Sequence, residues 1–368
     1  MTRGHTFICL LPLLIGYSSQ SCEKDYLHNL EELLLKLNKI RSLEKGLFDG
    51  LKKLIDLQLH INEIDTIEEG TFDDLENLQT LHLAKNHLSS VSSVLFSKLH
   101  KLQVLRLYEN QLTAIPDDIF EKLSNLKEIA LQNNKITAIS THLFPHKNKL
   151  SKILLDNNIL TELPPEIFVG FPLLKTLTLN GNKLASLPPV LFGEMPKLTE
   201  LSLSQNSLTS LPQGVFKSFE GLEKLTELNL QYNQIKSLKA NTFEKLTSLT
   251  TLKLAHNSLG TLPEDIFDPL PKLSKVYLNN NTWHCDCRMV PLFNWMKENP
   301  GKIKSTSPEI CNQPEDLKGQ EIMSLKEDHL SWKEQVFIMF CTLSVYLLCV
   351  YFYLCMYVFL LDHTDPLN

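Results

Sequence analysis

The histidines, cysteines and carboxylates are the residues of this chain that could do chemistry, and their spacing argues against an active site. The twelve histidines are scattered, and there is no H-E-x-x-H, no G-x-S-x-G and no phosphate-binding glycine loop. Cys285 and Cys287 form a C-x-C pair, but Cys311 is the only further cysteine of that region, which makes a poor four-ligand zinc set. We therefore predict no catalytic residue, no metal and no cofactor, and we favour a disulfide at these cysteines.

One candidate modification site stands beside those cysteines. Asn280-Asn-Thr282 is the only N-x-S/T sequence in the chain, so Asn280 is the candidate for N-glycosylation. It directly precedes Asn281, which belongs to the repeat pattern described next, and the sequence leaves its occupancy open.

A 24-residue period must position all of these residues. The stretch from Leu174 to Leu184 reads L-x-x-L-x-L-x-x-N-x-L, and the same spelling recurs with every step of 24 residues except one of 27. The asparagines of this pattern are Asn38, Asn62, Asn86, Asn110, Asn134, Asn158, Asn182, Asn206, Asn233, Asn257 and Asn281. A column of phenylalanines follows at the same period, from Phe48 to Phe267. The period predicts an α/β leucine-rich-repeat solenoid, or horseshoe, with about eleven repeats over residues 30–280 and a parallel sheet on its concave face.

Each position of the repeat has an expected role. The two leucines of L-x-L should point inward from a short strand while the residues around them point outward. The asparagine amide should bond backbone groups of the turn and of the adjacent coil, and the phenylalanine should pack the convex side. The three extra residues, around 218–220, should lie on the convex side and leave the strand register intact.

The N-terminal segment is typical of a secretory signal. Arg3 precedes a short apolar run, and small residues follow at Ser19 and Ser21, which predicts a signal peptide over residues 1–21. Residues 22–29, with the single Cys22, would then form a short N-terminal cap. A lost exon, or an end that packs on a partner, remains an alternative explanation of so short a cap.

The segment over residues 281–332 resembles the cysteine-flanked C-terminal cap of extracellular leucine-rich-repeat proteins. Asn281-Thr-Trp283-His-Cys285-Asp-Cys287 corresponds to the N-P-W-x-C-D-C opening of that cap. With the L-P-x-x-x-F spelling of the repeats, the chain resembles the group of the carboxypeptidase N regulatory subunit and platelet glycoprotein V. The resemblance implies a disulfide between Cys285 and Cys311. Trp332 stands where the fourth cysteine is expected, and Thr282 replaces the proline, so Cys287 is free or pairs with Cys22 or another chain.

An uncharged segment follows the cap. Residues 336–361 are long enough for a transmembrane helix, which leaves 362–368 as a cytoplasmic tail. This predicts a single-pass type I plasma-membrane protein with extracellular repeats. A mis-joined exon near Trp332, a lipid anchor and a secreted protein are the alternatives. Cys349 and Cys355 are expected to pack as apolar residues, with acylation of Cys355 as the alternative.

The outward face of the predicted sheet offers the best candidate for binding. Acids and bases alternate there and the net charge is only −6, which argues against a nucleic-acid groove. Tyr and Arg are the usual anchors of protein interfaces. Tyr108 is expected to stand clear between Ala84 and Ala130, and the other candidates lie nearby. The predicted patch comprises His60, His82, Arg106 and Tyr108; the alternative is an ordinary solvated face.

These observations predict a non-enzymatic extracellular module that binds a protein on its concave face, as an adhesion or receptor-like protein does. The resemblance implies the alternative, a secreted carrier subunit that stabilises a partner enzyme. Innate recognition of microbial ligands is a third possibility. The sequence names neither the ligand nor the oligomeric state.

Overall fold

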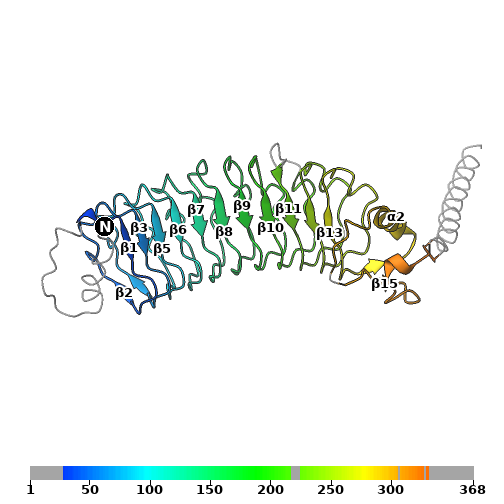
Figure 1. Cartoon of the computed structure of the whole chain (residues 1–368), viewed down its shortest axis with the longest axis horizontal. Coiled ribbons are helices and arrows are strands. Elements are labelled where there is room, and N and C mark those ends of the chain that lie inside the picture. The colour runs from blue at the N-terminus through cyan, green and yellow to red at the C-terminus, as the bar shows by residue number, and fades with distance from the viewer. Residues whose placement is uncertain (1–27, 217–223, 306, 327–328, 331–368) are drawn as a thin grey trace, which may run out of the picture.

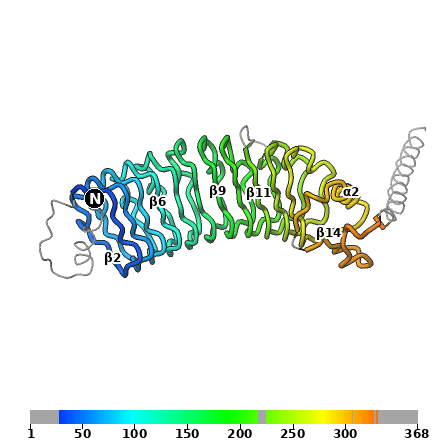
Figure 2. Tube along the Cα trace, viewed as in Figure 1, coloured from blue at the N-terminus to red at the C-terminus, as the bar shows by residue number. Residues whose placement is uncertain are grey.

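The computed structural model describes residues 28–216, 224–305, 307–326 and 329–330. Over these residues the chain winds into one long, shallow arc whose strands lie side by side from the N-terminal end to the cap (Figure 1, Figure 2). Several predicted features lie outside the described residues. They are the signal peptide, Cys22, Trp332, the membrane span with Cys349 and Cys355, and the tail.

The arc is built on an eleven-stranded parallel sheet with one strand per repeat. The strands are β1 (Glu32–Leu34), β3 (Asp56–Gln58), β5 (Thr80–His82), β6 (Val104–Arg106), β7 (Glu128–Ala130), β8 (Lys152–Leu154), β9 (Thr176–Thr178), β10 (Glu200–Ser202), β11 (Glu227–Asn229), β12 (Thr251–Lys253) and β13 (Lys275–Tyr277). Their central residues align across the sheet, as Leu57 does with Leu33 and Leu81. The predicted parallel-sheet solenoid of about eleven turns is therefore confirmed.

The asparagines of the repeat hold successive turns together. Asn158 Nδ2 donates to the carbonyls of Leu131, one repeat earlier, and Leu155, at 3.0 and 3.1 Å. Asn158 Oδ1 accepts the Ile136 N–H at 3.1 Å. The side chain is buried, and the same three bonds recur from Asn62 to Asn281, so each amide satisfies backbone groups of two repeats at once.

The side opposite the sheet consists of turns, which corrects the helical part of the α/β prediction. The N–H groups of Leu123 and Leu126 donate to the carbonyls of Phe120 and Leu123, three residues back, whereas an α-helix needs a four-residue step. Prolines at this side also favour turns over helix. Two short strands, β2 (Ser42–Leu43) and β4 (Thr66–Ile67), pair here. Phenylalanines of successive repeats stack, as Phe48 and Phe72 do at 6.0 Å.

The 27-residue repeat keeps its strand in register. Residues 217–223 lie outside the described chain. Leu201 of β10 nevertheless pairs with Leu228 of β11, like every other pair of central residues. The insertion therefore leaves the sheet uninterrupted, as the sequence predicted.

A cap covers the C-terminal edge of the sheet. It contains β14 (Trp283–His284), η3 (Cys287–Met289), α2 (Val290–Glu298), β15 (Cys311–Gln313) and η4 (Ile322–Ser324). Val276 of β13 exchanges backbone hydrogen bonds of 2.8 Å with Lys302 and Lys304, so the cap satisfies the last strand's open edge. Among the described residues, no helix is long and apolar enough to cross a membrane.

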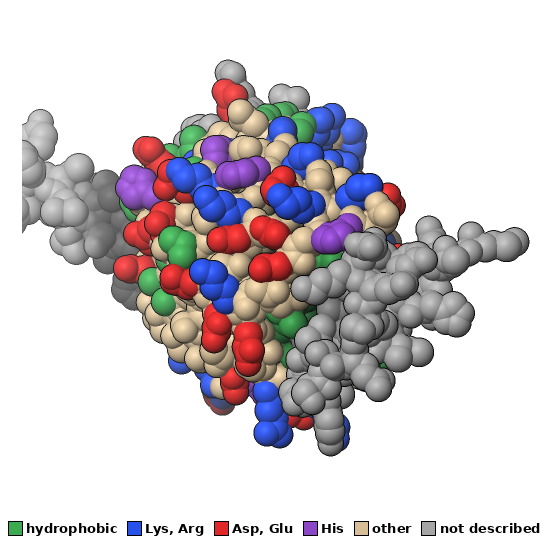
Figure 3. Space-filling model, turned by 90° about the vertical axis from the view of Figure 1, so that its left-hand side faces the viewer, with side chains coloured by type: hydrophobic (Ala, Val, Ile, Leu, Met, Phe, Trp, Pro, Cys, Tyr) green, Lys and Arg blue, Asp and Glu red, His purple; other side chains and the backbone are tan. Residues whose placement is uncertain are grey.

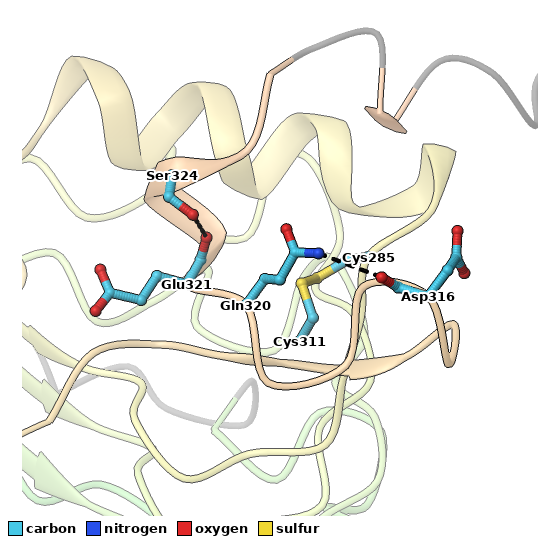
Figure 4. The surroundings of a disulfide bond; sticks show 6 residues. All are labelled: Cys285, Cys311, Asp316, Gln320, Glu321 and Ser324. Atoms are coloured by element: carbon cyan, nitrogen blue, oxygen red, sulfur yellow. Dashed lines mark hydrogen bonds between the residues drawn. A yellow bond between two sulfur atoms is a disulfide. The ribbon is translucent and has the colours of Figure 1, made fainter.

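One disulfide closes the cap. Cys285 bonds Cys311, with 5.7 Å between their Cα atoms, which is the pairing that the resemblance implies. Around it, Gln320 Nε2 donates to the Asp316 carbonyl and Ser324 Oγ to the Glu321 carbonyl (Figure 4). Cys287 is a free, half-exposed thiol.

Candidate protein-binding face

The structure brings the four predicted residues together on β3, β5 and β6 and the turns that follow them. The rings of His60 and His82 stack with centroids 3.9 Å apart, and the Tyr108 ring lies 5.6 Å from that of His82. Arg106 lies beside His82 because the two are register partners on neighbouring strands. We refer to His60, His82, Arg106 and Tyr108 as the His–Tyr cluster.

Tyr108 does not stand clear of the sheet, so that expectation was wrong. Backbone bonds from Ile61 to Ala84 and from Lys85 to Tyr108 place His60, Ala84 and Tyr108 in one row across three strands. Ala84, between His60 and Tyr108 in this row, is fully buried. The Tyr108 ring packs near that of His82, with 46° between the ring planes, and is only half-exposed.

Burial keeps the two histidines neutral. It lowers the pKa of His82 to about 3, and the neighbouring His60, Arg106 and Lys36 act in the same direction. The pKa of His60 is also lowered, first by burial and then by Lys36 and Arg106. Because both pKa values lie below the ordinary value of 6.5, the stack carries no charge at neutral pH.

The polar groups of the cluster are only partly satisfied. His82 Nδ1 lies 2.9 Å from Gln58 Oε1, and Arg106 Nε donates to Glu128 Oε1 at 2.9 Å. Within the described chain, His82 Nε2 and His60 Nδ1 are buried without a hydrogen-bond partner. Buried polar atoms normally find a partner, so these two nitrogens are exceptions among the buried polar atoms of the described chain.

Apolar residues border the cluster at the N-terminal end. Leu37 and Ile61 occupy the same position in successive repeats and are 67% and 39% exposed. The Leu37 N–H donates to the His60 carbonyl, which places Leu37 next to the stack. Figure 3 looks onto this end and shows acidic and basic side chains interspersed around small hydrophobic areas. An apolar and aromatic centre with a mixed polar surround is typical of protein interfaces.

A second aromatic pair, which the sequence analysis missed, lies toward the cap. The rings of Tyr232 and His256 stack at 4.1 Å, and Tyr232 is 49% exposed. His256 Nε2 lies 3.1 Å from Nδ2 of the exposed glycosylation candidate Asn280. Tyr232, His256 and Asn280 each directly precede a repeat asparagine, so a comparison of that column across repeats would have found them.

The described residues do not bring metal ligands together. No group of three or more His, Cys, Asp or Glu side chains in the described part of the chain could hold a metal ion.

Comparison with known proteins agrees with this geometry. The family described as leucine rich repeat matches in overlapping segments from residue 28 to residue 160 and from residue 148 to residue 282. The chain belongs to the leucine-rich-repeat family. No curated protein matches it, so the closer resemblance to the carboxypeptidase N regulatory subunit group stays a prediction.

A solved structure is similar over most of this leucine-rich-repeat protein. It is a chain of the octameric complex of Latrophilin 3, Unc5D and FLRT2, the last represented by its leucine-rich repeats. The TM-score is 0.61 at 26% sequence identity, with 83% of this chain and 85% of that chain covered. Family and similarity together identify a protein-interaction module of a kind that is typically non-enzymatic.

Proposed function

We propose that this leucine-rich-repeat protein is an extracellular adhesion or receptor-like molecule that binds a protein ligand on the exposed face of its sheet. The observation that carries the proposal is the His–Tyr cluster, where stacked rings, two unpartnered buried nitrogens and the exposed Leu37 and Ile61 lie together. Aromatic residues and arginine dominate the binding energy of protein interfaces when they are centrally placed and desolvated. The similar solved structure is itself a complex of several proteins.

The cap supports an extracellular setting. A disulfide such as Cys285–Cys311 persists in oxidising compartments and is rare in the cytosol. The predicted signal peptide over 1–21 and membrane span over 336–361 would place the repeats outside the cell and tether them there.

The ligand can be sought on intact cells that express the full chain. Proximity labelling from the wild-type repeats is compared with labelling from Tyr108→Ala and His60→Ala variants at equal surface levels. We expect a labelled cell-surface protein whose recovery falls at least tenfold with Tyr108→Ala, since truncation of a central aromatic anchor costs 2 kcal/mol or more. Equal recovery from wild type and both variants would contradict a ligand on the His–Tyr cluster.

The tether has its own test. Alkaline carbonate extraction of membranes should leave the protein in the membrane fraction. Release into the culture medium would instead favour the secreted carrier-subunit alternative, and co-purification of a partner enzyme from the medium would then be the decisive observation.

A further inference from the structure

A strip of lysines runs along the edge of the solenoid where the central strands begin. The four residues before each of β6, β7, β8, β9 and β10 are HKLQ, SNLK, NKLS, PLLK and PKLT. The leucine in the third place is buried in every case, and none of the other residues is. These segments hold one lysine each and no acid: Lys101, Lys127, Lys149, Lys175 and Lys197. We refer to these five residues as the lysine strip.

The strip is distinct from its surroundings in charge. The chain as a whole carries a net charge of −6, but the five segments of the strip carry five positive charges. The acid-free run is bounded by Glu76 before β5 and, in the sequence, by Glu223 before β11. Two of these strands begin with an acid: Glu128 of β7 is paired with Arg106, and Glu200 of β10 is exposed. Successive parallel strands lie about 4.8 Å apart, so the strip extends for roughly 19 Å.

The lysines are positioned by the fold without being neutralised by it. Lys101 Nζ donates to Asn77 Oδ1 at 2.6 Å, Lys127 Nζ to Gln103 Oε1 at 2.8 Å, and Lys149 Nζ to Asn125 Oδ1 at 2.6 Å. Each partner is an uncharged amide of the preceding repeat. Within the described chain, none of the five lysines forms an ion pair. Their full charge therefore remains available to a ligand.

A cavity opens in the middle of the strip, beside a position where this repeat has a lysine in place of an apolar residue. Three residues after the repeat phenylalanine, neighbouring repeats bury Leu123 and Phe171, whereas this repeat places Lys147. Its Nζ donates to the Val169 carbonyl at 2.8 Å and lies 5.1 Å from the Phe171 ring centroid. The resulting cavity of about 340 Å³ is lined by Lys147, Lys149, His146 and Ser124 among others. Its basic lining suits one anionic group.

A linear polymer with anionic groups along its length matches this geometry better than a compact ligand, because the charges form a single row, one per repeat. Among linear polyanions, the disulfide-bonded cap favours one found outside cells. We propose that the lysine strip binds a linear sulfated polysaccharide and that the cavity beside Lys147 receives one of its sulfate groups. The choice of polysaccharide rests on the extracellular setting of the proposed function, but the site itself is separate from the His–Tyr cluster.

The test uses the full chain and a size-defined heparin oligosaccharide. The triple variant Lys127→Gln, Lys149→Gln, Lys175→Gln removes three charges of the strip. Each lysine near a polyanion contributes a factor of about five, so we expect affinity to fall about 100-fold. The slope of log Kd against log salt concentration should also become shallower, because fewer counterions are exchanged.

The matched control removes three charges elsewhere. Lys135, Lys183 and Lys236 are equally exposed and lie past the strand ends, and Lys135 likewise contacts an amide of the preceding repeat, Gln111. Their triple glutamine variant should bind heparin within threefold of wild type. Equal losses in both triple variants, or no loss in the strip variant, would overturn the proposal. Tighter binding of single-stranded DNA or of phosphatidylserine vesicles than of heparin would assign the strip to another polyanion and overturn it too.

Two further variants separate the parts of the site and the two proposals. Lys147→Met should weaken binding of a short oligosaccharide about fivefold, and unchanged affinity would remove the cavity from the site. Tyr108→Ala should leave heparin affinity unchanged, and the strip variant should leave recovery of the sheet-face ligand unchanged. Failure of the heparin experiment would thus be distinguishable from failure of the proposed protein ligand.

Discussion

The His–Tyr cluster and the lysine strip lie on the same scaffold and use polar groups in opposite ways. In the cluster, burial keeps His60 and His82 neutral, and two ring nitrogens are left without a partner in the described chain. In the strip, the ammonium groups of Lys101, Lys127 and Lys149 contact neutral amides of the preceding repeat. The first surface is suited to a partner that fits its shape, while the second attracts any chain of matching charge. A repeat scaffold can therefore carry different surfaces while its core stays the same.

The largest expected effects test whether the scaffold beneath the two surfaces is the same. Asn110 lies two residues after Tyr108 of the cluster, and Asn182 belongs to a repeat that carries the strip residue Lys175; each makes three buried backbone hydrogen bonds of 3.0 Å. Alanine at either position leaves one buried N–H and two carbonyls without this partner. We expect each variant to lose about 3 kcal/mol of unfolding free energy in urea titrations.

The two regions would not share the same scaffold if the losses of unfolding free energy in the two asparagine variants differed by more than about 1 kcal/mol. Such a result would mean that the regions differ in their cores and not only in their outward side chains. Asn294→Ala serves as the control, since Asn294 is exposed on α2 and its replacement should change stability little.

The next expected effect is a loss of unfolding free energy at low pH, which arises from His82 of the His–Tyr cluster. The folded pKa of His82 is about 3, below the ordinary value of 6.5, so the unfolded chain binds the proton more readily. The stabilising contribution is complete above pH 6.5 and is lost as pH falls from 6.5 toward 3. Between pH 7 and pH 4.5, wild type should lose on the order of 1–2 kcal/mol more than His82→Gln, allowing for solvent screening.

Lys149→Gln is a control for this pH dependence. This strip variant should follow the wild-type pH dependence, because it leaves the histidine stack untouched. A His82→Gln curve parallel to wild type would show that the stack does not resist protonation, and the contrast between a neutral cluster and a charged strip would fail.

The repeat scaffold could be predicted from sequence because its core positions are periodic. The asparagine and phenylalanine columns occupy the same place in every turn, so a single pattern predicts burial and backbone bonding. The Cys285–Cys311 pairing followed from the resemblance of the cap and not from the period. The pattern wrongly predicted helix on the side opposite the sheet. The backbone N–H groups of the turns there donate to carbonyls three residues back.

The surfaces were harder to predict because they depend on side-chain direction and on columns of charge. Membership of the cluster followed from strand alternation, but the contact between the rings of Tyr108 and His82 depends on side-chain direction. The lysine strip was missed because charge was judged over the whole chain and over the sheet, where acids and bases do alternate. The lysine strip becomes visible when the four residues before each strand are aligned across the repeats.

A smaller effect concerns the half-buried lysine at the cavity. Lys147→Leu restores the apolar residue that this position has in Leu75, Leu99 and Leu123. Burial lowers the pKa of Lys147, which indicates that its charge is held at some cost. We expect the leucine variant to gain about 1 kcal/mol of unfolding free energy, measured by urea midpoint. A loss of stability would instead show that the bond from Lys147 to the Val169 carbonyl outweighs that cost.

The smallest effects compare single charges of the two surfaces. Arg106 is paired with Glu128 at 2.9 Å, and their side chains are 34% and 19% exposed. Arg106→Gln should therefore lower the unfolding free energy by about 0.5–1 kcal/mol. Lys127→Gln removes an exposed charge with no acidic partner in the described chain, and the change should stay within about 0.3 kcal/mol. If the lysine change cost as much as the arginine change, the strip would be part of the folding energetics, and its charge would no longer argue for a ligand. If only Arg106→Gln lowers the unfolding free energy, the charge of Arg106 stabilises the fold, whereas the charge of Lys127 does not and remains available to a ligand.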